Sequence, residues 1–276
     1  MASIPKHLDE LEQLIWQAYE KANEGSFRLS RIGASFIGTE CDRAVWLDWR
    51  GATYKKFPGR ILRLFKTGHS QEERVLQDLK DAGLEVWAFD EKGDQWTYTF
   101  GHFVAKLDGV VRGVPGAERT PHTLEIKSSN LKGFKEIQNR GVQIAKPLHY
   151  AQMQIGMELA GLTRSLYVCI CKDDEKLYVE RVIRDDTAIA DLLAKINRIV
   201  ESENPPIPIA ETESDWRCKF CDQKAVCWKQ ERPLATCRMC RNGVAAENGE
   251  WVCGLSSKVL SQSEQIAACE EWEGIL

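Results

Sequence analysis

The sequence predicts an α/β fold followed by a small cysteine-rich module at its C-terminal end. Helical and strand-like periodicities alternate over most of the 276 residues, a pattern typical of a sheet covered by helices. After the proline-rich stretch 204–208, periodic apolar residues become sparse and cysteines become frequent. We therefore expect a main domain over 1–230, with a central mixed sheet flanked by helices, and a metal-binding module over 231–276.

The first half of the main domain contains helices and strands in turn. Apolar residues three and four apart predict an amphipathic helix from Pro5 to Ala22. A second helix is expected from Gln71 to Ala82, with Ser70 as its N-cap and Gly83 at its end. Segments rich in β-branched and aromatic residues predict strands at 85–89, 96–107, 109–114 and 122–128, with a turn at 115–121.

Three further elements complete the main domain. Pro147 suits the first turn of a helix over 148–159, which Gly161 ends. Beyond this helix we expect a strand hairpin at 166–171 and 177–183, and then a helix at 185–202.

Composition excludes several classes of protein. Lysine and arginine number 37 against 41 acidic residues, so DNA binding would depend on local basic patches rather than on overall charge. No apolar run approaches the roughly 18–20 residues of a spanning helix, and the N-terminal residues do not resemble a secretory signal. We therefore expect no membrane association and a cytoplasmic location, in a bacterium or a phage-infected host. A phosphate-binding Gly-x(4)-Gly-Lys-[Ser/Thr] loop is lacking, so the chain is not itself a helicase.

The ten cysteines are unevenly placed. In a reducing cytoplasm, clustered thiols are more often metal ligands than disulfides. Cys169 and Cys171 alternate with apolar residues on a predicted strand, so we assign them to the core. Of the others, Cys41 stands alone and seven lie between 218 and 269.

The sharpest local pattern is an Asp-Gly pair followed by Glu-Ile-Lys. Glu125 and Lys127 are two apart on a predicted strand and therefore share one face, opposite two apolar neighbours. If Asp108 lies on the adjacent strand, two carboxylates and an ammonium converge. Hard oxygen ligands suit Mg²⁺ or Mn²⁺, which activates water and neutralises phosphate charge. The alternative is a surface strand that carries a solvated Glu–Lys pair.

Two further polar positions extend this pattern. His69 and Glu73 are four apart, close enough to share a helical face, and a neutral imidazole suits a metal ion as an extra ligand. Gln152, on the helix after the Glu-x-Lys strand, is placed to hydrogen-bond a phosphate or the lysine. Taken singly, each is more simply explained as a helical residue without a catalytic task.

Taken in order, Gly-His-x(2)-Glu-Glu, Asp-Gly, Glu-Ile-Lys and Tyr-x-Gln-x-Gln-x-Gly resemble the motifs of the PD-(D/E)XK nuclease superfamily. The resemblance covers residues 30–230. Within the superfamily the motifs most resemble the RecB-type branch, which includes CRISPR-associated and phage recombination exonucleases. It implies a restriction-endonuclease-like fold. The chain departs from the family pattern at Leu107, where the motif has proline, and at Gly156, where it has tyrosine.

The resemblance implies a complete metal-dependent nuclease site. The metal ligands that it implies are His69, Asp108, Glu125 and the backbone carbonyl of Ile126. Lys127 would position the attacking water, and Gln152 would support the site. The sequence does not decide whether Glu72 or Glu73 is the family's helical acid.

A first cysteine set belongs to the end of the main domain. Cys218, Cys221 and Cys227 form Cys-x(2)-Cys-x(5)-Cys, one thiolate short of a tetrahedral site or a cubane cluster. The RecB-type branch joins such a trio to an upstream cysteine around a [4Fe–4S] cluster, which implies Cys41 as the fourth ligand. The cluster would act as a staple by closing a very long loop. Zinc at this set, or an inert buried Cys41, are the alternatives.

A second cysteine set forms the C-terminal module. A Cys-x(2)-Cys knuckle followed by two more cysteines has the composition of a structural Zn²⁺ site. Its members are Cys237, Cys240, Cys253 and Cys269. A zinc site with another fourth ligand, and thiols without metal, stay open as alternatives.

Together the motifs predict a metal-dependent DNA exonuclease that acts on single- or double-stranded ends in phage recombination, repair or DNA processing. One alternative is a DNA-binding or processing subunit of a larger complex, for CRISPR adaptation or as part of a helicase–nuclease, with little activity alone. Either function allows a recombination or CRISPR partner protein. The third interpretation is a metal-stapled interaction protein without affinity for DNA.

Overall fold

A five-stranded mixed sheet lies at the centre of the computed structural model, which describes residues 8–25, 29 and 31–276. The strands, in sheet order, are β2 (Glu85–Trp87), β5 (Gly109–Arg112), β6 (His122–Ser129), β7 (Arg164–Cys171) and β8 (Leu177–Ile183). β6 and β7 are parallel, and the other neighbouring pairs are antiparallel. The predicted α/β class with a central mixed sheet is confirmed.

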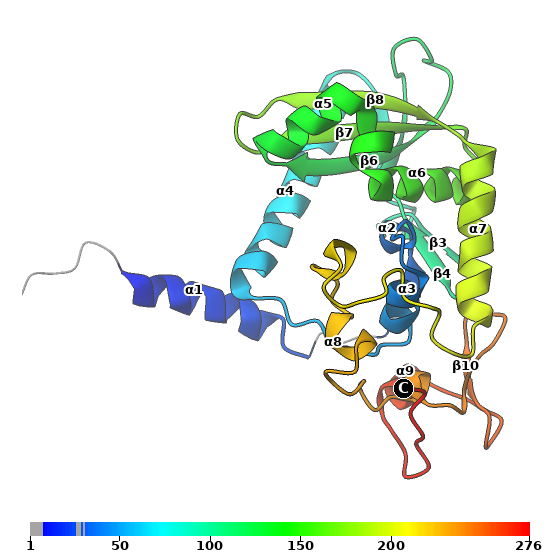
Figure 1. Cartoon of the computed structure of the whole chain (residues 1–276). Helices are drawn as coiled ribbons and strands as arrows, with labels where there is room; N and C mark the ends of the chain where they lie inside the picture. The colour runs from blue at the N-terminus through cyan, green and yellow to red at the C-terminus, as the bar shows by residue number, and fades with distance from the viewer. Residues whose placement is uncertain (1–7, 26–28, 30) are drawn as a thin grey trace, which may run out of the picture.

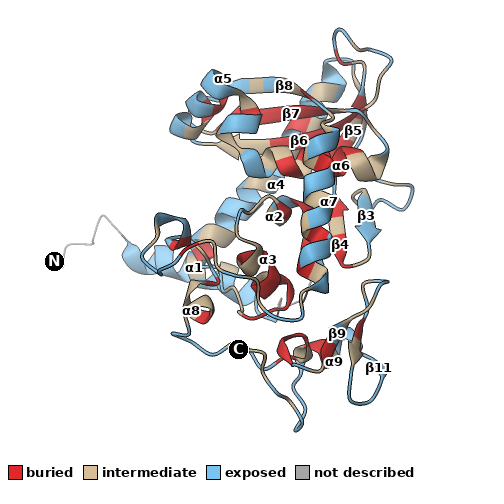
Figure 2. Ribbon diagram, turned by 45° about the vertical axis from the view of Figure 1, so that its right-hand side comes forward, coloured by how far each residue is buried: buried red, intermediate tan, exposed pale blue. Residues whose placement is uncertain are grey.

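Helices cover both faces of this sheet (Figure 1). On one face, α4 (Gly59–Asp81) packs so that Val75 joins Leu124 and Ile126 of β6 in a buried cluster. On the other face, α5 (Leu131–Ala145) and α6 (Pro147–Ala160) connect β6 to β7 and pack around Phe134 and Tyr167. Because both of their faces are covered, β6 and β7 are almost wholly buried (Figure 2).

Segment 96–107 is a hairpin rather than the single strand that its composition predicts. β3 (Thr97–Phe100) and β4 (Phe103–Lys106) are antiparallel neighbours on either side of a turn at Gly101. Gly101 has a φ of 50°, a left-handed conformation that glycine adopts without a steric cost. β4 also pairs with β1 (Ile32–Gly33), so these strands form a separate three-stranded sheet.

Two predicted helices have different N-terminal ends in the structure. α1 is Asp9–Ala22, and the predicted residues 5–7 lie outside the described residues. α4 begins at Gly59, directly after Pro58, and runs through the residues that we expected to precede the helix. Ser70 is therefore not an N-cap, and its hydroxyl donates a hydrogen bond to the Lys66 carbonyl within the helix. Strong helix formers from 61 to 66 outweigh the single glycine at 68.

Among the described residues before α6, three helices have no counterpart in the prediction. They are α2 (Ala34–Ile37), α3 (Asp42–Trp49) and α5. α3 is buried on most sides and therefore lacks an amphipathic stripe. α5 contains two glycines, and Gly141, with a φ of 72°, kinks it. The hairpin of β7 and β8, α6 and α7 (Asp186–Glu201) agree with the prediction.

The chain after α7 has little regular structure but packs firmly on α3. Its elements are the 3₁₀ helices η1 (Trp216–Cys218) and η2 (Cys237–Met239), the helices α8 (Lys224–Cys227) and α9 (Gln262–Ile266), and the strands β9 (Gly243–Ala245), β10 (Trp251–Cys253) and β11 (Lys258–Val259). Met239, Trp251 and Leu260 lie in the same buried cluster as Trp46 and Trp49 of α3. The predicted boundary at 230 stays a prediction.

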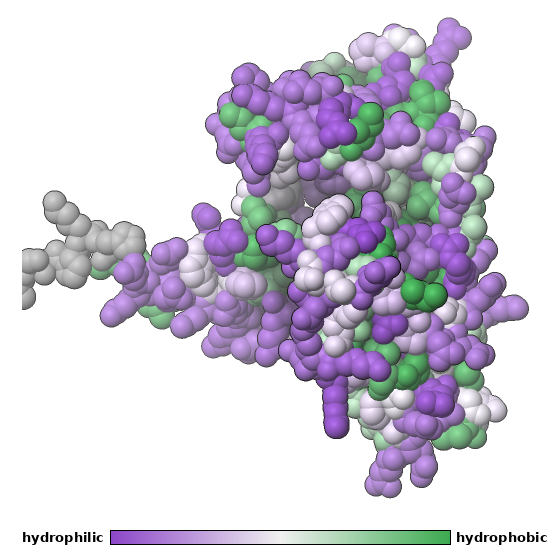
Figure 3. Space-filling model, in the orientation of Figure 1, coloured by the Kyte–Doolittle hydropathy of each residue, from purple (hydrophilic) through white to green (hydrophobic). Residues whose placement is uncertain are grey.

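The block that contains the five-stranded sheet is connected to the part around α3 and the C-terminal segment through α4 and α7 (Figure 1). The surface is hollowed between these two parts (Figure 3). α1 packs against α4 and extends outward, with most of its residues exposed (Figure 2). Within the described ranges, no helix is both long and apolar enough to cross a membrane.

Candidate active site

The Asp-Gly and Glu-Ile-Lys motifs meet where β5 and β6 are neighbours. Gly109 of β5 pairs with Leu124 of β6, which places Asp108 beside the middle of β6. The Asp108 carboxylate accepts a hydrogen bond from the Ile126 N–H, with 2.7 Å between Oδ2 and N. Because the N–H and C=O of one strand residue face the same neighbouring strand, the Ile126 carbonyl lies on the Asp108 side as well. The structure therefore brings this carboxylate and this carbonyl to one edge.

β6 presents Glu125 and Lys127 on the face opposite Leu124 and Ile126, as its two-residue period requires. The apolar pair packs beneath α4, whereas Glu125 and Lys127 form an ion pair. Glu125 is only 2% exposed, although the Lys127 side chain keeps 27% of its surface. A solvated surface pair would leave both side chains in water, so the structure excludes that alternative.

α4 contributes a third carboxylate to the site. Burial raises the pKa of Glu72, and the neighbouring charge of Asp108 raises it further, while Lys127 and His69 oppose the shift. These influences place Glu72 among the motif residues. Glu73 is exposed and does not line the cavity described below. The structure thus brings Glu72, rather than Glu73, to the cavity and to Asp108, a choice that the sequence left open.

The site contains more buried negative charge than Lys127 neutralises. Burial raises the pKa of Glu125 to about 8, against the opposing charge of Lys127. Burial also raises the pKa of Asp108, although Lys127 and the Ile126 N–H lower it in part. Burial lowers the pKa of Lys127, but the charges of Glu125 and Asp108 outweigh this and the net shift is upward. Each carboxylate is therefore held where a cation would stabilise its ionised form.

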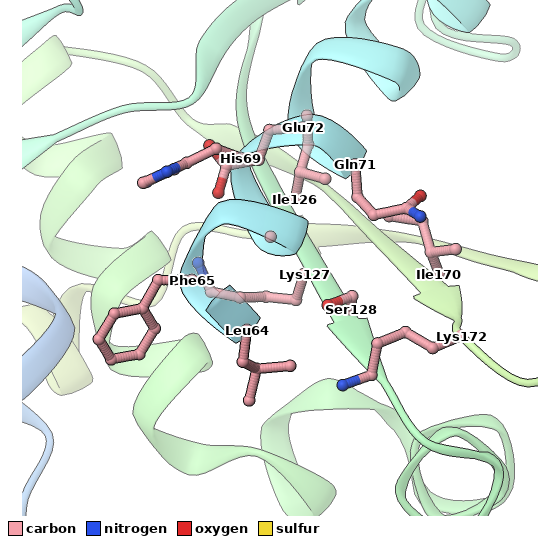
Figure 4. Close-up of a pocket in the computed structure, with 11 residues that line it drawn as sticks. Leu64, Phe65, His69, Gln71, Glu72, Ile126, Lys127, Ser128, Ile170 and Lys172 are labelled. Carbon is pink, nitrogen blue, oxygen red and sulfur yellow. The ribbon is translucent and has the colours of Figure 1, made fainter. Parts of the chain in front are cut away.

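A cavity of about 410 Å³ opens beside these groups, between α4 and β6 (Figure 4). Figure 4 shows Lys127 passing beneath α4 toward Phe65, with Lys172 on the far side of Ser128. The cavity is lined from α4 and from the ends of β6 and β7 by Leu64, Phe65, Gly68, His69, Gln71, Glu72, Ile126, Lys127, Ser128, Ile170 and Lys172. It has a volume in the range of pockets that hold small ligands.

Sequence reasoning missed several cavity residues, and Phe65 and Lys172 are the most informative of them. Phe65 is 44% exposed and makes an edge contact with Phe57, with 5.1 Å between ring centroids. Phe65 and His69 are four apart on α4, so a correct start of that helix would have placed both on one face. Lys172 follows the last residue of β7, and nothing in its sequence neighbourhood indicates the site.

Gln152 does not line the cavity. It is half-buried on α6, where no hydrogen bond of its side chain is found within the described part of the chain. It lies one turn beyond His149, whose pKa burial lowers to about 3, with smaller contributions from the charges of Lys127 and Lys146. α6 therefore runs close to Lys127, but the structure does not join Gln152 to the carboxylates.

Gln154 is the fully buried glutamine of this motif. Its amide nitrogen donates to the Ile183 carbonyl at 2.9 Å, and its amide oxygen accepts from the Asp185 N–H at 2.8 Å. Gln154 therefore joins α6 to the connection between β8 and α7. This role is structural.

The two departures from the family pattern touch one another. A Cβ placed on Gly156 would lie 2.9 Å from Cδ2 of Leu107. Leu107 is buried directly before Asp108, and Gly156 is buried on α6. A leucine at the first position thus requires a small residue at the second, so the departures are one packing arrangement beside the site.

The first cysteine set lines one small cavity. Cys41 precedes α3, Cys218 ends η1, Cys221 lies between η1 and α8, and Cys227 ends α8. All four line the same space. The Arg43 guanidinium donates a hydrogen bond to the Cys227 sulfur, with 3.2 Å between Nε and Sγ. The structure therefore brings together residues that are far apart in the sequence.

The second cysteine set gathers in the C-terminal segment. Burial raises the pKa of Cys237, and the charges of Cys269, Cys240 and Cys253 raise it further, which places all four thiols near one another. As the side chains stand, no group of three or more His, Cys, Asp or Glu residues among 8–25, 29 and 31–276 is arranged to hold a metal ion. Within each set the thiols lie near one another, but they are not arranged as the ligands of a bound metal ion.

No family model and no curated protein matches the chain. Similar solved structures include an alkaline exonuclease, LHK-Exo, from Laribacter hongkongensis, which is 21% identical with a TM-score of 0.43 over 66% of this chain and 90% of that one. The same exonuclease in complex with dAMP is 18% identical, with a TM-score of 0.43 over 68% and 90%. A crystal structure of SSO0001 is 14% identical, with a TM-score of 0.45 over 79% and 96%. Similarity at this level concerns chain arrangement and says nothing of activity.

Proposed function

We propose that this protein is a Mg²⁺- or Mn²⁺-dependent deoxyribonuclease of the PD-(D/E)XK type that hydrolyses phosphodiester bonds at DNA ends. The supporting observation is the gathering of Glu72, Asp108 and Glu125 with Lys127 at one end of a solvent-connected cavity. Buried carboxylates beside a lysine are costly in a structural core and serve well in phosphate chemistry. A role in function therefore explains the raised pKa values of these carboxyl groups better than a structural role does.

The residues present fit a hard divalent cation. The carboxylates of Asp108 and Glu125 and the Ile126 carbonyl offer oxygen donors on neighbouring strands, and Glu72 and His69 face them from α4. The raised pKa values of Glu125 and Asp108 reflect buried charge without sufficient compensation, which a cation supplies. When bound, the ion lowers the pKa of water and neutralises charge on the phosphate.

The chain's own residues orient the reaction. Lys127 is held by Glu125 at the cavity wall, where its ammonium can position a water or stabilise charge on the phosphate oxygens. Asp108 is fixed by the Ile126 N–H and cannot swing away without losing that bond. Phe65 and Leu64 give the cavity an apolar flank.

We place an iron–sulfur cluster at the first cysteine set. Four thiols around one cavity match the ligand number of a [4Fe–4S] cluster, and the Arg43 N–H bond to Cys227 is the kind of contact that stabilises cluster thiolates. Bound there, the cluster would tie the segment before α3 to α8 and close a long loop. No step of hydrolysis depends on it.

The finer assignments rest on the motifs. Resemblance to the RecB-type branch supports exonuclease action in phage recombination, repair or DNA processing, on single- or double-stranded ends. It also supports a cytoplasmic location and a recombination or CRISPR partner protein. The hollowed surface beside α4 and the sheet offers a place where DNA would approach (Figure 3).

The decisive experiment follows end-labelled linear DNA, single- and double-stranded, with anaerobically purified full-length protein and Mn²⁺ or Mg²⁺. Closed circular DNA is incubated in parallel. Lys127→Ala should reduce cleavage at least about 100-fold. Glu72→Gln should reduce it strongly, whereas the matched variant Glu73→Gln on the exposed side of α4 should cleave like the wild type.

Each outcome discriminates between the functions. Metal-dependent loss of linear DNA that spares circles supports the exonuclease, while cleavage of circles indicates an endonuclease with the same site. DNA binding without cleavage by folded, metal-loaded protein would favour the DNA-binding subunit. Equal loss in the Glu72 and Glu73 variants would contradict the assignment made on α4.

A further inference from the structure

The second cysteine set has no part in the proposed nuclease reaction, yet the fold brings its members together from three segments. Cys253 at the end of β10 pairs with Gly243 of β9. A Cβ on Gly243 would lie 2.0 Å from the Cys237 carbonyl oxygen, and the Gly243 N–H donates to the Cys240 carbonyl at 2.9 Å. The Cys-x(2)-Cys turn therefore packs directly against the strand that pairs with Cys253.

The last segment returns to the same turn. The Cys237 thiol donates to the Ala267 carbonyl, with 3.2 Å between Sγ and O, two residues before Cys269. The Trp272 indole N–H donates to the Thr236 carbonyl at 2.8 Å. Residues 262–276 are thus held against the knuckle, which brings the fourth cysteine to the other three.

Hydrogen bonds already surround one of these sulfurs. Ser256, through its hydroxyl and its backbone N–H, and the Leu255 N–H are hydrogen-bonded to the Cys253 sulfur. Donors around a sulfur hold a thiolate ligand in position at metal sites. Cys253 is partly exposed and also contacts the apolar cluster around Trp251.

The segment also lacks a core of its own. Its strands contain two or three residues each, and α9 contains five. Its large buried apolar residues, Met239, Trp251 and Leu260, point into the cluster shared with α3. Short segments of this kind usually need a cross-link or a metal ion to stay ordered.

From these observations we propose that Cys237, Cys240, Cys253 and Cys269 bind one structural Zn²⁺, independently of the nuclease site. Four thiolates form a closed tetrahedral site, which leaves no position for substrate and suits a structural role. Binding replaces the four thiol protons by one Zn²⁺, releases four protons to solvent and changes no oxidation state.

The ion would fix a buried dipeptide, Arg238–Met239, in the core of the protein. Arg238 and Met239 lie between the first two ligands and are 5% and 0% exposed. Arg238 donates to the Trp49 carbonyl at 2.9 Å, and its guanidinium lies 5.1 Å from the centre of the Trp251 ring. Fixing Cys237 and Cys240 therefore fixes both ends of the dipeptide that joins the C-terminal segment to α3.

Metal analysis of full-length, anaerobically purified protein tests this inference. We expect one zinc per chain in the wild type and loss of most of that zinc in Cys253→Ser and Cys269→Ser, with iron unchanged. Cys169→Ser, which removes a buried thiol from β7, is the matched control and should keep its zinc. Zinc that persists in both ligand variants, or iron that falls with them, overturns the proposal.

A second measurement covers ligand variants that fail to fold. Full-length Cys221→Ser keeps the second cysteine set and removes absorption from iron bound at the first. After chelation, titration with Co²⁺ should produce tetrahedral thiolate bands that saturate at one Co²⁺ per chain and disappear when Zn²⁺ is added. Chelation should also shift tryptophan emission to the red, because Arg238 and Met239 would no longer be held against the buried tryptophan rings. Absence of the thiolate bands refutes the site.

Discussion

Replacing Met239 with alanine tests whether the C-terminal segment shares one core with the rest of the protein. Met239 is fully buried in the cluster that contains Trp46 and Trp251. Truncating such a methionine costs about 2–5 kcal/mol, because apolar contacts are lost and a cavity is left. With an unfolding entropy of about 2 cal/mol/K per residue, each kcal/mol lowers the Tm of a chain of this size by roughly 2 °C. The expected decrease is therefore about 4–10 °C.

Calorimetry and tryptophan fluorescence of the full-length protein, kept anaerobic, measure this decrease. Val244→Ala in β9 is the matched control, since Val244 is 51% exposed and its truncation should change stability by less than about 0.5 kcal/mol. In Met239→Ala both probes should shift together in one transition. A small separate transition that moves while the main transition stays in place would refute the shared core.

Two other buried groups give predictions of stability. Burial lowers the pKa of His102 to about 4, and nearby arginines lower it further against its hydrogen bond to Ala246. Since the unfolded chain binds that proton near pH 6.5, stability should rise with pH between about 4 and 6.5. When the pH falls from 7.5 to 5, the free energy of unfolding measured in urea should therefore decrease by about 2 kcal/mol less in His102→Gln than in the wild type. Equal decreases in the two proteins would contradict the reasoning. Gln154→Ala should cost about 1–3 kcal/mol, because two backbone partners are left unsatisfied, while cleavage per folded molecule stays unchanged. Gln152→Ala should leave cleavage and the Tm unchanged, because Gln152 does not line the cavity, and a loss of cleavage would place Gln152 in the site.

The residues of the site that follow from strand periodicity were predictable. Glu125 and Lys127 must share a face on any strand, and an Asp-Gly pair at the start of the adjacent strand needs only an antiparallel neighbour to reach them. The choice of Glu72 over Glu73 was not predictable, because it depends on the rotation of α4 about its axis. That rotation is set by the packing of residues such as Val75 against the sheet.

Other errors have local causes. The helical signal of α5 is weakened by glycines, although Asn130 caps it and tertiary packing of Phe134 holds it in place. The early start of α4 was obscured by Ser70, which has the chemistry of a cap but bonds backward within the helix. Propensity alone cannot distinguish these cases, because each is decided by contacts with distant residues.

The contact between Leu107 and Gly156 gives two departures from the motif one packing cause. Considered one at a time along the sequence, a missing proline and a missing tyrosine both weaken the resemblance. In the structure they occupy one space beside Asp108, so each explains the other. The space around a site depends on pairs of residues that pack against one another, so two substitutions can compensate each other.

The residues that make the site destabilising and those that stabilise the fold lie in different parts of the molecule. Buried carboxylates at β5 and β6 destabilise the protein until a cation compensates them. α3 lies elsewhere, and both cysteine sets are tied to it: the first through Cys41 at its start, and the second through Arg238, which bonds Trp49 near its end (Figure 1). Removing metal from either cysteine set should therefore lower stability before it alters the chemistry of folded molecules.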